Sequence, residues 1–187
     1  SLHDALPISL TVKILLSTCC RIGELARAKW TDVDFENSTW TIPIENSKTS
    51  KAFVIPLPER TASWFRELQP LSLNSAFVLP ARQTRREKTH GEPMHYEQRA
   101  LNSMLHKLTP KLNKVRRFTP HDLRATARSH LAALGVDDVI AERCLNHSLG
   151  GLLKIYNKYD YFAERQLALE VWTSFIVACE AGKTWKI

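Results

Sequence analysis

The sequence predicts an α+β domain that is mainly α-helical and carries one small antiparallel sheet, either a hairpin or three strands. Apolar residues recur at helical spacing over most of the chain. One block, residues 39–57, instead holds β-branched and aromatic residues on both sides of a polar turn, which is the pattern of two paired strands. The 187 residues are enough for one domain with a real core, or for one domain plus a fragment, and they contain no internal repeat.

The first half of the chain is expected to hold several helices and the strand pair. A bend is expected at residues 21–23, between two of the helices. Pro43 and Pro56 confine their strands to an edge or an end of the sheet, because proline lacks the amide hydrogen that a ladder needs. The predicted elements are helices over residues 9–20 and 22–29, strands over 39–44 and 52–57, a helix over 59–68, a short apolar segment at 77–79 and a helix over 97–108.

A strong helix start lies at residues 119–122. Thr119 suits the N-cap, Pro120 the first helical position and Asp122 the first turn. This helix is expected to end just before Gly135, which suits the position that follows a helix. The next predicted helix is capped by Asp137 or Asp138 and ends near residue 146. A short helix over 152–156 and a longer one over 162–179 are predicted to follow.

The chain is basic, with a formal net charge of +7 and a pI of about 9.4. Such a charge favours a polyanionic partner, DNA or RNA, although a basic protein with no such partner has a similar composition. No apolar run reaches the roughly 18–20 residues that a membrane span needs, so no membrane association is expected. Four cysteines without CxxC spacing fit a reduced, cytosolic compartment.

A metal or nucleotide site is not expected. Cys144 and His147 stand three residues apart, but zinc requires about four ligands and no further pair with a suitable spacing accompanies them. The sequence has no glycine-rich phosphate loop, so ATP is not implied. The prediction is therefore a protein that uses neither a metal nor a cofactor.

Six polar side chains, spread over four short segments, suit attack on a phosphodiester. Arginine forks neutralise a phosphate, a cation or an imidazole moves protons, and a phenol can act as the nucleophile. The most specific local signal is a histidine and an arginine at i, i+3 near a helix start, although a capping histidine and a surface arginine would give the same spacing. The six are Arg21, Lys48, His121, Arg124, His147 and Tyr156.

These residues lie in the segments TCCRIGEL, ENSKTSKAFVIPL, TPHDLRATA and LNHSLGGLLKIYNKY. In this order, between residues 9 and 175, the chain resembles the tyrosine recombinase (phage integrase) family of DNA strand-exchange enzymes. The resemblance implies the fold of that family's catalytic domain. It also implies site-specific DNA recombination, the integration or excision of a mobile element such as a prophage, through a 3′-phosphotyrosyl intermediate and without metal or ATP.

The resemblance implies that Arg21 and Arg124 bind the scissile phosphate. It gives Glu24 the supporting role of steadying the fold around Arg21, and it makes His121 the general base for the phenol proton. Arg21 lies beside a largely apolar stretch and therefore needs a charged or polar partner, which Glu24 can supply. An ion pair between Arg21 and Glu24, without any ligand, would explain the presence of both residues equally well.

Lys48 stands in the turn between the predicted strands, where the family carries a lysine that protonates the leaving 5′ oxygen. Lys51 is a competing candidate for this role. The family's second histidine, matched by His147, hydrogen-bonds the phosphate, whereas a histidine at a helix C-terminus also interacts with the helix dipole. Asn146 occupies a position where the family usually has glycine, and asparagine also tolerates a left-handed backbone.

Three tyrosines stand close together after this histidine. The family places its nucleophile nine residues after the second histidine, which gives Tyr156. Tyr159 and Tyr161 are expected to pack on the approach to the last helix.

Double-stranded DNA is the expected partner, and the resemblance implies a tetramer on DNA in the bacterial cytoplasm, associated with the nucleoid. A basic loop over residues 80–95 is expected to contact phosphates or to be a solvated connector, and its cations are Arg82, Arg85, Arg86 and Lys88. In the family the C-terminal segment often docks on a neighbour. Four apolar residues are considered for that role: Trp172, Phe175, Ile176 and Trp185. The first three are expected to pack in the core instead.

Residues 1–8 look unlike the family and are expected to be a foreign segment, so the catalytic domain is placed at residues 9–187, without the family's N-terminal DNA-clamping domain. Three alternatives stay open. The first is a helix-turn-helix-like DNA-binding protein without chemistry, built on the two helices that flank Gly135. The others are a truncated, recombination-deficient integrase remnant and a topoisomerase-like enzyme that relaxes supercoils. The sequence does not define the DNA target site or the direction of recombination.

Overall fold

The structure of the chain is a computed structural model that describes residues 2–81, 95–108, 116–148 and 159–185. Over these residues it is mainly helical with a three-stranded antiparallel sheet, so the predicted fold class is confirmed. The helices are α1 (Leu2–Thr18), α2 (Ile22–Ala26), η1 (Trp30–Asp32), α3 (Glu59–Leu68), η2 (Gln69–Ser72), α5 (Gln98–Leu108), α6 (Pro120–Ala133), α7 (Asp138–Cys144) and α9 (Phe162–Glu180). The strands are β1 (Val33–Asp34), β2 (Thr39–Ile42) and β3 (Phe53–Pro56).

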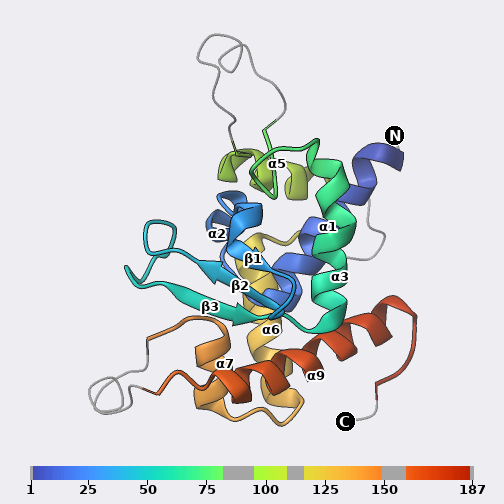
Figure 1. Cartoon of the computed structure of the whole chain (residues 1–187). Coiled ribbons are helices and arrows are strands. Elements are labelled where there is room, and N and C mark those ends of the chain that lie inside the picture. The colour runs from blue at the N-terminus through green and yellow to red at the C-terminus, as the bar shows by residue number, and fades with distance from the viewer. Residues whose placement is uncertain (1, 82–94, 109–115, 149–158, 186–187) are drawn as a thin grey trace.

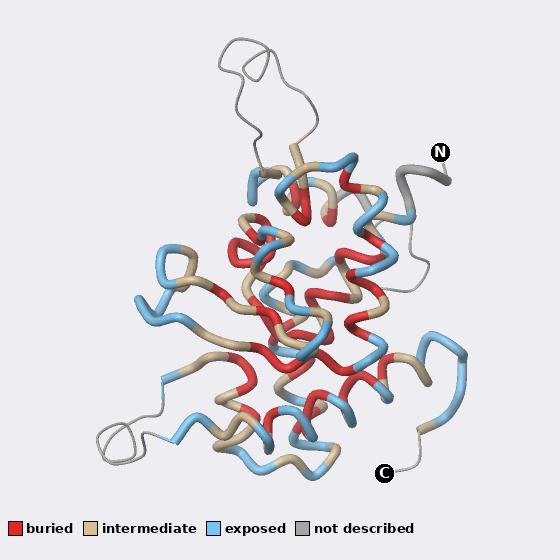
Figure 2. Tube along the Cα trace, viewed as in Figure 1, coloured by how far each residue is buried: buried red, intermediate tan, exposed pale blue. Residues whose placement is uncertain are grey.

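The hydrophobic core forms where α1 packs against α3, α6 and α9. Figure 2 shows that the buried stretches of these helices face one another at the centre of the molecule. Three tryptophans, Trp40, Trp64 and Trp172, are among the largest fully buried side chains. The indole nitrogen of Trp172 donates to the Leu16 carbonyl at 2.8 Å, so this ring also joins α9 to α1. Burial of such rings supplies much of the energy that holds helices together.

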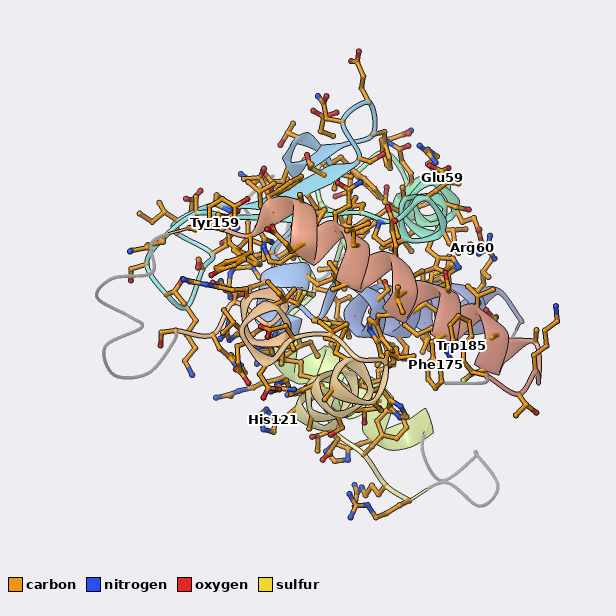
Figure 3. All side chains as sticks on the ribbon, turned by 90° about the horizontal axis from the view of Figure 1, so that it is seen from below. Glu59, Arg60, His121, Tyr159, Phe175 and Trp185 are labelled. Atoms are coloured by element: carbon orange, nitrogen blue, oxygen red, sulfur yellow. The ribbon has the colours of Figure 1, made fainter. Side chains whose placement is uncertain are left out.

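Core packing of the last helix is confirmed for Trp172 and Ile176, which are both buried. Phe175 is half-buried and stacks on Trp172 with 5.6 Å between ring centroids. On its other side Phe175 meets Trp185 edge-on at 5.9 Å, and Figure 3 shows these two rings beside the C-terminal part of α9. The C-terminal tail therefore lies against its own helix at this point.

The sheet has the order β1-β2-β3, and Trp40 pairs with Ile55 across its centre. Figure 1 shows the β2–β3 hairpin reaching away from the packed helices. Strand β2 ends two residues earlier than predicted, because the chain turns at Pro43, whose carbonyl accepts hydrogen bonds from the amides of Asn46 and Ser47. Ile44 therefore lies in the turn with 58% of its surface exposed, and not in a strand. Strand β3 is one residue shorter than predicted at each end.

The chain breaks between α1 and α2 as predicted, but the break lies at residues 19–21 and not at 21–23, because residues 22 and 23 already belong to α2. Helix α1 ends at Thr18, and Cys19 has a left-handed backbone with φ of +54°. Helix α2 is shorter than predicted and ends at Ala26. The chain leaves the helix there because Lys29 forms a β-bridge with Phe77, which also places the predicted apolar segment at 77–79 against this part of the chain.

The predicted start of α6 is confirmed. The Thr119 hydroxyl accepts from the Asp122 amide at 3.3 Å, and the Asp122 carboxylate accepts from the Thr119 amide at 2.7 Å, which is a reciprocal capping box. Gly135 follows the helix with φ of +80°, as expected for the residue after a helix end. Asp137 caps α7 by accepting from the Val139 amide at 2.8 Å.

Candidate active site

Five of the six predicted site residues meet at one open pocket of about 600 Å³. Its walls come from α2, the β2–β3 turn, the starts of α5 and α6, and the segment after α7. Sequence positions more than a hundred residues apart thus contribute to one surface. The residues that line the pocket are Arg21, Ile22, Gly23, Glu24, Arg27, Glu45, Asn46, Ser47, Lys48, Gln98, Pro120, His121, Arg124 and His147.

Arg21 stands at the N-cap of α2 and is held by Glu24 at two points. The Glu24 carboxylate accepts from the Arg21 backbone amide at 2.7 Å and from its guanidinium at 3.1 Å. The Glu24 side chain is 2% exposed, whereas that of Arg21 is 23% exposed. A buried carboxylate therefore fixes the guanidinium from behind and leaves part of it open to the pocket, so the expected ion pair exists and still allows a ligand.

Arg124 is buried in the pocket wall and is 7% exposed. Its guanidinium donates to the Cys19 carbonyl and, at 2.8 Å, to the Leu145 carbonyl. Burial and then the nearby charge of Arg21 lower the pKa of Arg124 below its usual value. Arginine nevertheless stays protonated, so the guanidiniums of Arg21 and Arg124 place two positive charges at one partly desolvated site. This arrangement favours the binding of an anion.

His121 lies in the first turn of α6, one turn before Arg124. It is exposed, and Figure 3 shows it at the outer edge of the molecule. Pro120 and His121, which begin this helix, line the pocket, and the N-terminal end of a helix dipole favours an anion. The predicted pair of residues on one helix turn is therefore present, with the arginine buried and the histidine open to solvent.

Lys48 is exposed in the β2–β3 turn and lines the pocket, whereas Lys51 does not line it. The turn is tied to α2 by Arg27, which contacts Asn46. This geometry favours Lys48 over Lys51 as the cation that reaches a ligand in the pocket.

His147 follows α7, where Asn146 has a left-handed backbone with φ of +50°. The sequence prediction that asparagine would accept this conformation is confirmed. One ring nitrogen of His147, Nε2, lies 3.0 Å from an Arg124 guanidinium nitrogen. The other, Nδ1, lies 2.6 Å from the Glu142 carboxylate.

Five predicted residues fall outside the described parts of the chain, and their roles stay predictions: Tyr156, Arg82, Arg85, Arg86 and Lys88. Of the two other tyrosines, Tyr161 is half-buried and Tyr159 meets it edge-on at 4.7 Å. Tyr159 is nevertheless 59% exposed, so the expectation that it packs into the fold is wrong for most of its surface. Within the described parts of the chain, Tyr161 is its aromatic neighbour, and Tyr159 lies outside the hydrophobic core.

Sequence reasoning missed Arg27 and Glu142, which hold other site residues in place. Arg27 contacts a residue 19 positions away, and Glu142 binds His147 and, at 2.8 Å, Arg128. Such pairs have no spacing signature in a single sequence. Glu142 stands next to Arg143, and Arg27 stands between Glu24 and Lys29, so neither residue is conspicuous in the sequence.

Among the described residues, no three histidine, cysteine, aspartate or glutamate side chains are grouped so as to hold a metal ion. Within the same residues, no helix is long and apolar enough to cross a membrane.

Three guanidiniums, two imidazoles and an ammonium line one open pocket together with two carboxylates, so the pocket of this mainly helical domain is suited to hold an anion. The comparison with known proteins identifies its family. The chain belongs to the phage integrase family, whose sequence model matches residues 3–162.

The chain is similar to several curated relatives. It is 27% identical to the prophage integrase IntA of Escherichia coli K12 over 168 residues, which cover 89% of this chain and 38% of IntA. It is 29% identical to the tyrosine recombinase XerA of Thermococcus kodakarensis over 151 residues, 80% of this chain and 50% of XerA. The chain thus spans half or less of the length of these relatives.

Solved structures show the same fold. The integrase from mycobacterium phage Brujita matches with a TM-score of 0.68 at 16% identity, over 89% of this chain and 52% of that one. A XerA recombinase crystal structure matches with a TM-score of 0.62 at 16% identity, over 97% of this chain and 59% of that one. The Tn1549 transposon integrase, solved in complex with a circular intermediate DNA, matches with a TM-score of 0.59 at 23% identity, over 75% of this chain and 50% of that one.

Proposed function

We propose that the chain is the catalytic domain of a tyrosine-type site-specific recombinase that acts on double-stranded DNA. The observation that carries the proposal is the convergence of Arg21, Arg124 and Lys48 with two histidines on one pocket. The names of the relatives support it, since they are integrases and tyrosine recombinases. The Tn1549 integrase in complex with DNA supports DNA as the ligand.

In the proposed reaction, Arg21 and Arg124 grip the two non-bridging oxygens of one DNA phosphate. Negative charge on these oxygens grows in the transition state, and donors that are already in place stabilise it without reorganisation. Each such donor contributes about 3–4 kcal/mol, or about 10²–10³ in rate. Glu24 and the carbonyls that hold Arg124 supply this preorganisation.

The chemistry itself transfers one phosphoryl group and two protons. The Tyr156 oxygen attacks phosphorus while His121 takes the phenol proton as general base. The bond from phosphorus to the 5′ oxygen breaks, and Lys48 gives that oxygen a proton. The product is a 3′-phosphotyrosyl link and a free 5′ hydroxyl. Attack by another 5′ hydroxyl reverses the step and joins strands without ATP or metal.

Several wider expectations belong to the same proposal. The chain would act as a tetramer on two DNA sites in the cytoplasm, with the basic loop cations on the DNA backbone. The catalytic domain would include residues 9–187, and helix α1, which begins at Leu2, extends it toward the N-terminus. Integration or excision of a mobile element would follow from repeated strand exchange.

Covalent trapping tests the proposal. The protein is incubated with nicked suicide duplexes of randomised sequence, and denaturant-resistant protein–DNA adducts are counted. Wild-type protein should form adducts, and Arg21→Lys should form about 10²–10³-fold fewer because lysine lacks the guanidinium fork. Its DNA affinity should stay close to wild type, since the charge is kept. Arg60→Lys, on the exposed face of α3, is the matched control.

The outcome separates the alternatives. DNA binding with no adduct from any duplex would support a DNA-binding protein without chemistry or an inactive remnant. Adducts with supercoil relaxation and no strand exchange would support the topoisomerase-like alternative.

A further inference from the structure

Glu142 does not line the pocket, but its carboxylate contacts His147, which does. Glu142 Oε2 lies 2.6 Å from His147 Nδ1, and His147 Nε2 lies 3.0 Å from the Arg124 guanidinium on the pocket side. The ring of His147 therefore stands between a carboxylate and a guanidinium, each at hydrogen-bonding distance from one of its two nitrogens.

These partners determine which ring nitrogen carries the hydrogen. An ionised carboxylate only accepts, so His147 Nδ1 is the donor toward Glu142. A guanidinium only donates, so Nε2 presents its lone pair to Arg124. The opposite neutral tautomer would set an N–H of the ring against an N–H of Arg124 and would leave two lone pairs facing each other at Glu142. The geometry is consistent with one neutral tautomer alone.

Glu142 is itself braced. Arg128 donates from Nε to Glu142 Oε1 at 2.8 Å and from its terminal nitrogen to Asp138 at 2.7 Å. Partial burial alone would raise the pKa of the Glu142 carboxyl, but the hydrogen bonds from Arg128 and His147 outweigh it, and the net shift is downward. Arg124 and Arg128 are one turn apart on α6, so one helix face holds both ends of the carboxylate–imidazole pair.

We propose that Glu142 is a positioning residue for the phosphate site, because it fixes the orientation and the tautomer of His147 and thereby keeps Nε2 directed at Arg124 and the pocket. The inference rests on the proposed function of Arg124 in holding a DNA phosphate. In this tautomer His147 accepts from Arg124, so it acts on the phosphate through that guanidinium. Arg128 acts one step further back, through Glu142. Neither residue touches the ligand.

The first test needs no DNA. Long-range ¹H–¹⁵N NMR spectra of the whole chain distinguish the two neutral tautomers of His147, at a pH where the ring is uncharged. Wild type should show the Nδ1–H form. Glu142→Gln should keep it, since the amide oxygen still accepts from Nδ1–H, whereas Glu142→Ala should move His147 toward the Nε2–H form. Glu170→Ala, on the exposed face of α9, is the matched control. An Nε2–H form in wild type, or no change in Glu142→Ala, would overturn the proposal.

The second test measures the rate of adduct formation in a single turnover on nicked duplexes. Removing the group that orients a histidine ligand lowers activity about 10–100-fold in metal sites, and a loss on this scale is expected for Glu142→Ala. Glu142→Gln should recover most of the rate, and melting temperatures check that each variant folds. Equal losses in both variants would contradict positioning. If wild type forms no adduct, the proposed function fails while the NMR result still decides the role of Glu142.

Discussion

The guanidinium of Arg27 holds Asn46 at two atoms. Its Nε donates to the Asn46 side-chain oxygen at 3.0 Å, and a terminal nitrogen donates to the Asn46 backbone carbonyl at 3.1 Å. Arg27 is the C-cap residue of α2, the helix that Arg21 begins, and Asn46 stands two residues before Lys48. One side chain thus connects the element that positions an arginine of the pocket to the turn that carries its lysine.

Removing this connection should free the turn. In Arg27→Ala, amide hydrogen exchange over residues 44–50 should rise about 10-fold, since each lost hydrogen bond contributes about 0.5–1.5 kcal/mol. Adduct formation should slow because Lys48 is less well placed. Arg27→Lys should behave like alanine, because a single ammonium does not reproduce the two-point contact. Exchange that matches the Arg60→Ala control would show that the turn is held by other contacts.

The identity of the general acid is testable with sulfur. In Lys48→Ala, single-turnover cleavage of ordinary DNA should fall about 10²–10⁴-fold, the usual contribution of a general acid. A duplex with sulfur at the 5′ bridging position should restore the rate, because a thiolate leaves without a proton. Lys51→Ala, which alters the neighbouring lysine outside the pocket, should cleave both substrates at near wild-type rates. Sulfur rescue of Lys51→Ala alone would reassign the role.

Local chemistry explains which parts of the fold could be predicted. The start of α6 follows from Thr119 and Pro120, whose preferences act within one turn of the chain, and α3 has its predicted bounds of Glu59–Leu68. The left-handed conformation at Asn146 and Gly135 is also a property of the residue itself. The family pattern added the expectation that distant segments share one site.

Long-range contacts explain what could not be predicted. Strand β1 has two residues, too few for an alternating pattern, and it exists because Val33 pairs with Trp40. Helix α2 stops early because Lys29 bridges to Phe77, a partner far along the sequence. The link from Glu142 to His147 likewise depends on how α7 ends and how α6 packs against it, which no local spacing reveals.

Arg165 should be a stability determinant. Its side chain is 1% exposed, and it donates to the Val54 carbonyl at 2.8 Å and to the Asp160 carboxylate at 2.5 Å. Arg165→Ala should lower the free energy of unfolding by about 3 kcal/mol, since the backbone carbonyls of Val54 and Asp160 lose their donor and a large buried side chain is removed. Urea denaturation measures this. The exposed Arg60–Glu67 pair offers the comparison, because Arg60→Ala should cost about 1 kcal/mol or less. Equal effects of the two variants would contradict the assigned role.

The capping box of α6 should make stability depend on pH. Hydrogen bonds from the Thr119 hydroxyl and amide lower the pKa of Asp122 below its ordinary value. A carboxyl with a lower pKa in the folded state stabilises the fold above its unfolded pKa of about 3.9, and this contribution is lost as the pH falls through the folded value. Asp122→Asn should therefore melt below wild type at neutral pH, and the gap should close in acid. A gap that is independent of pH would rule out this linkage.

In the proposed reaction, a tyrosine attacks a phosphate that Arg21 and Arg124 hold. The most direct measurement is mass spectrometry of the nuclease-treated adduct, which identifies the residue that carries the nucleotide. We expect a modified Tyr156, no adduct from Tyr156→Phe with DNA binding retained, and adducts as in wild type from Tyr159→Phe and Tyr161→Phe. An adduct that persists in Tyr156→Phe, or a nucleotide found on another residue, would contradict the proposed reaction.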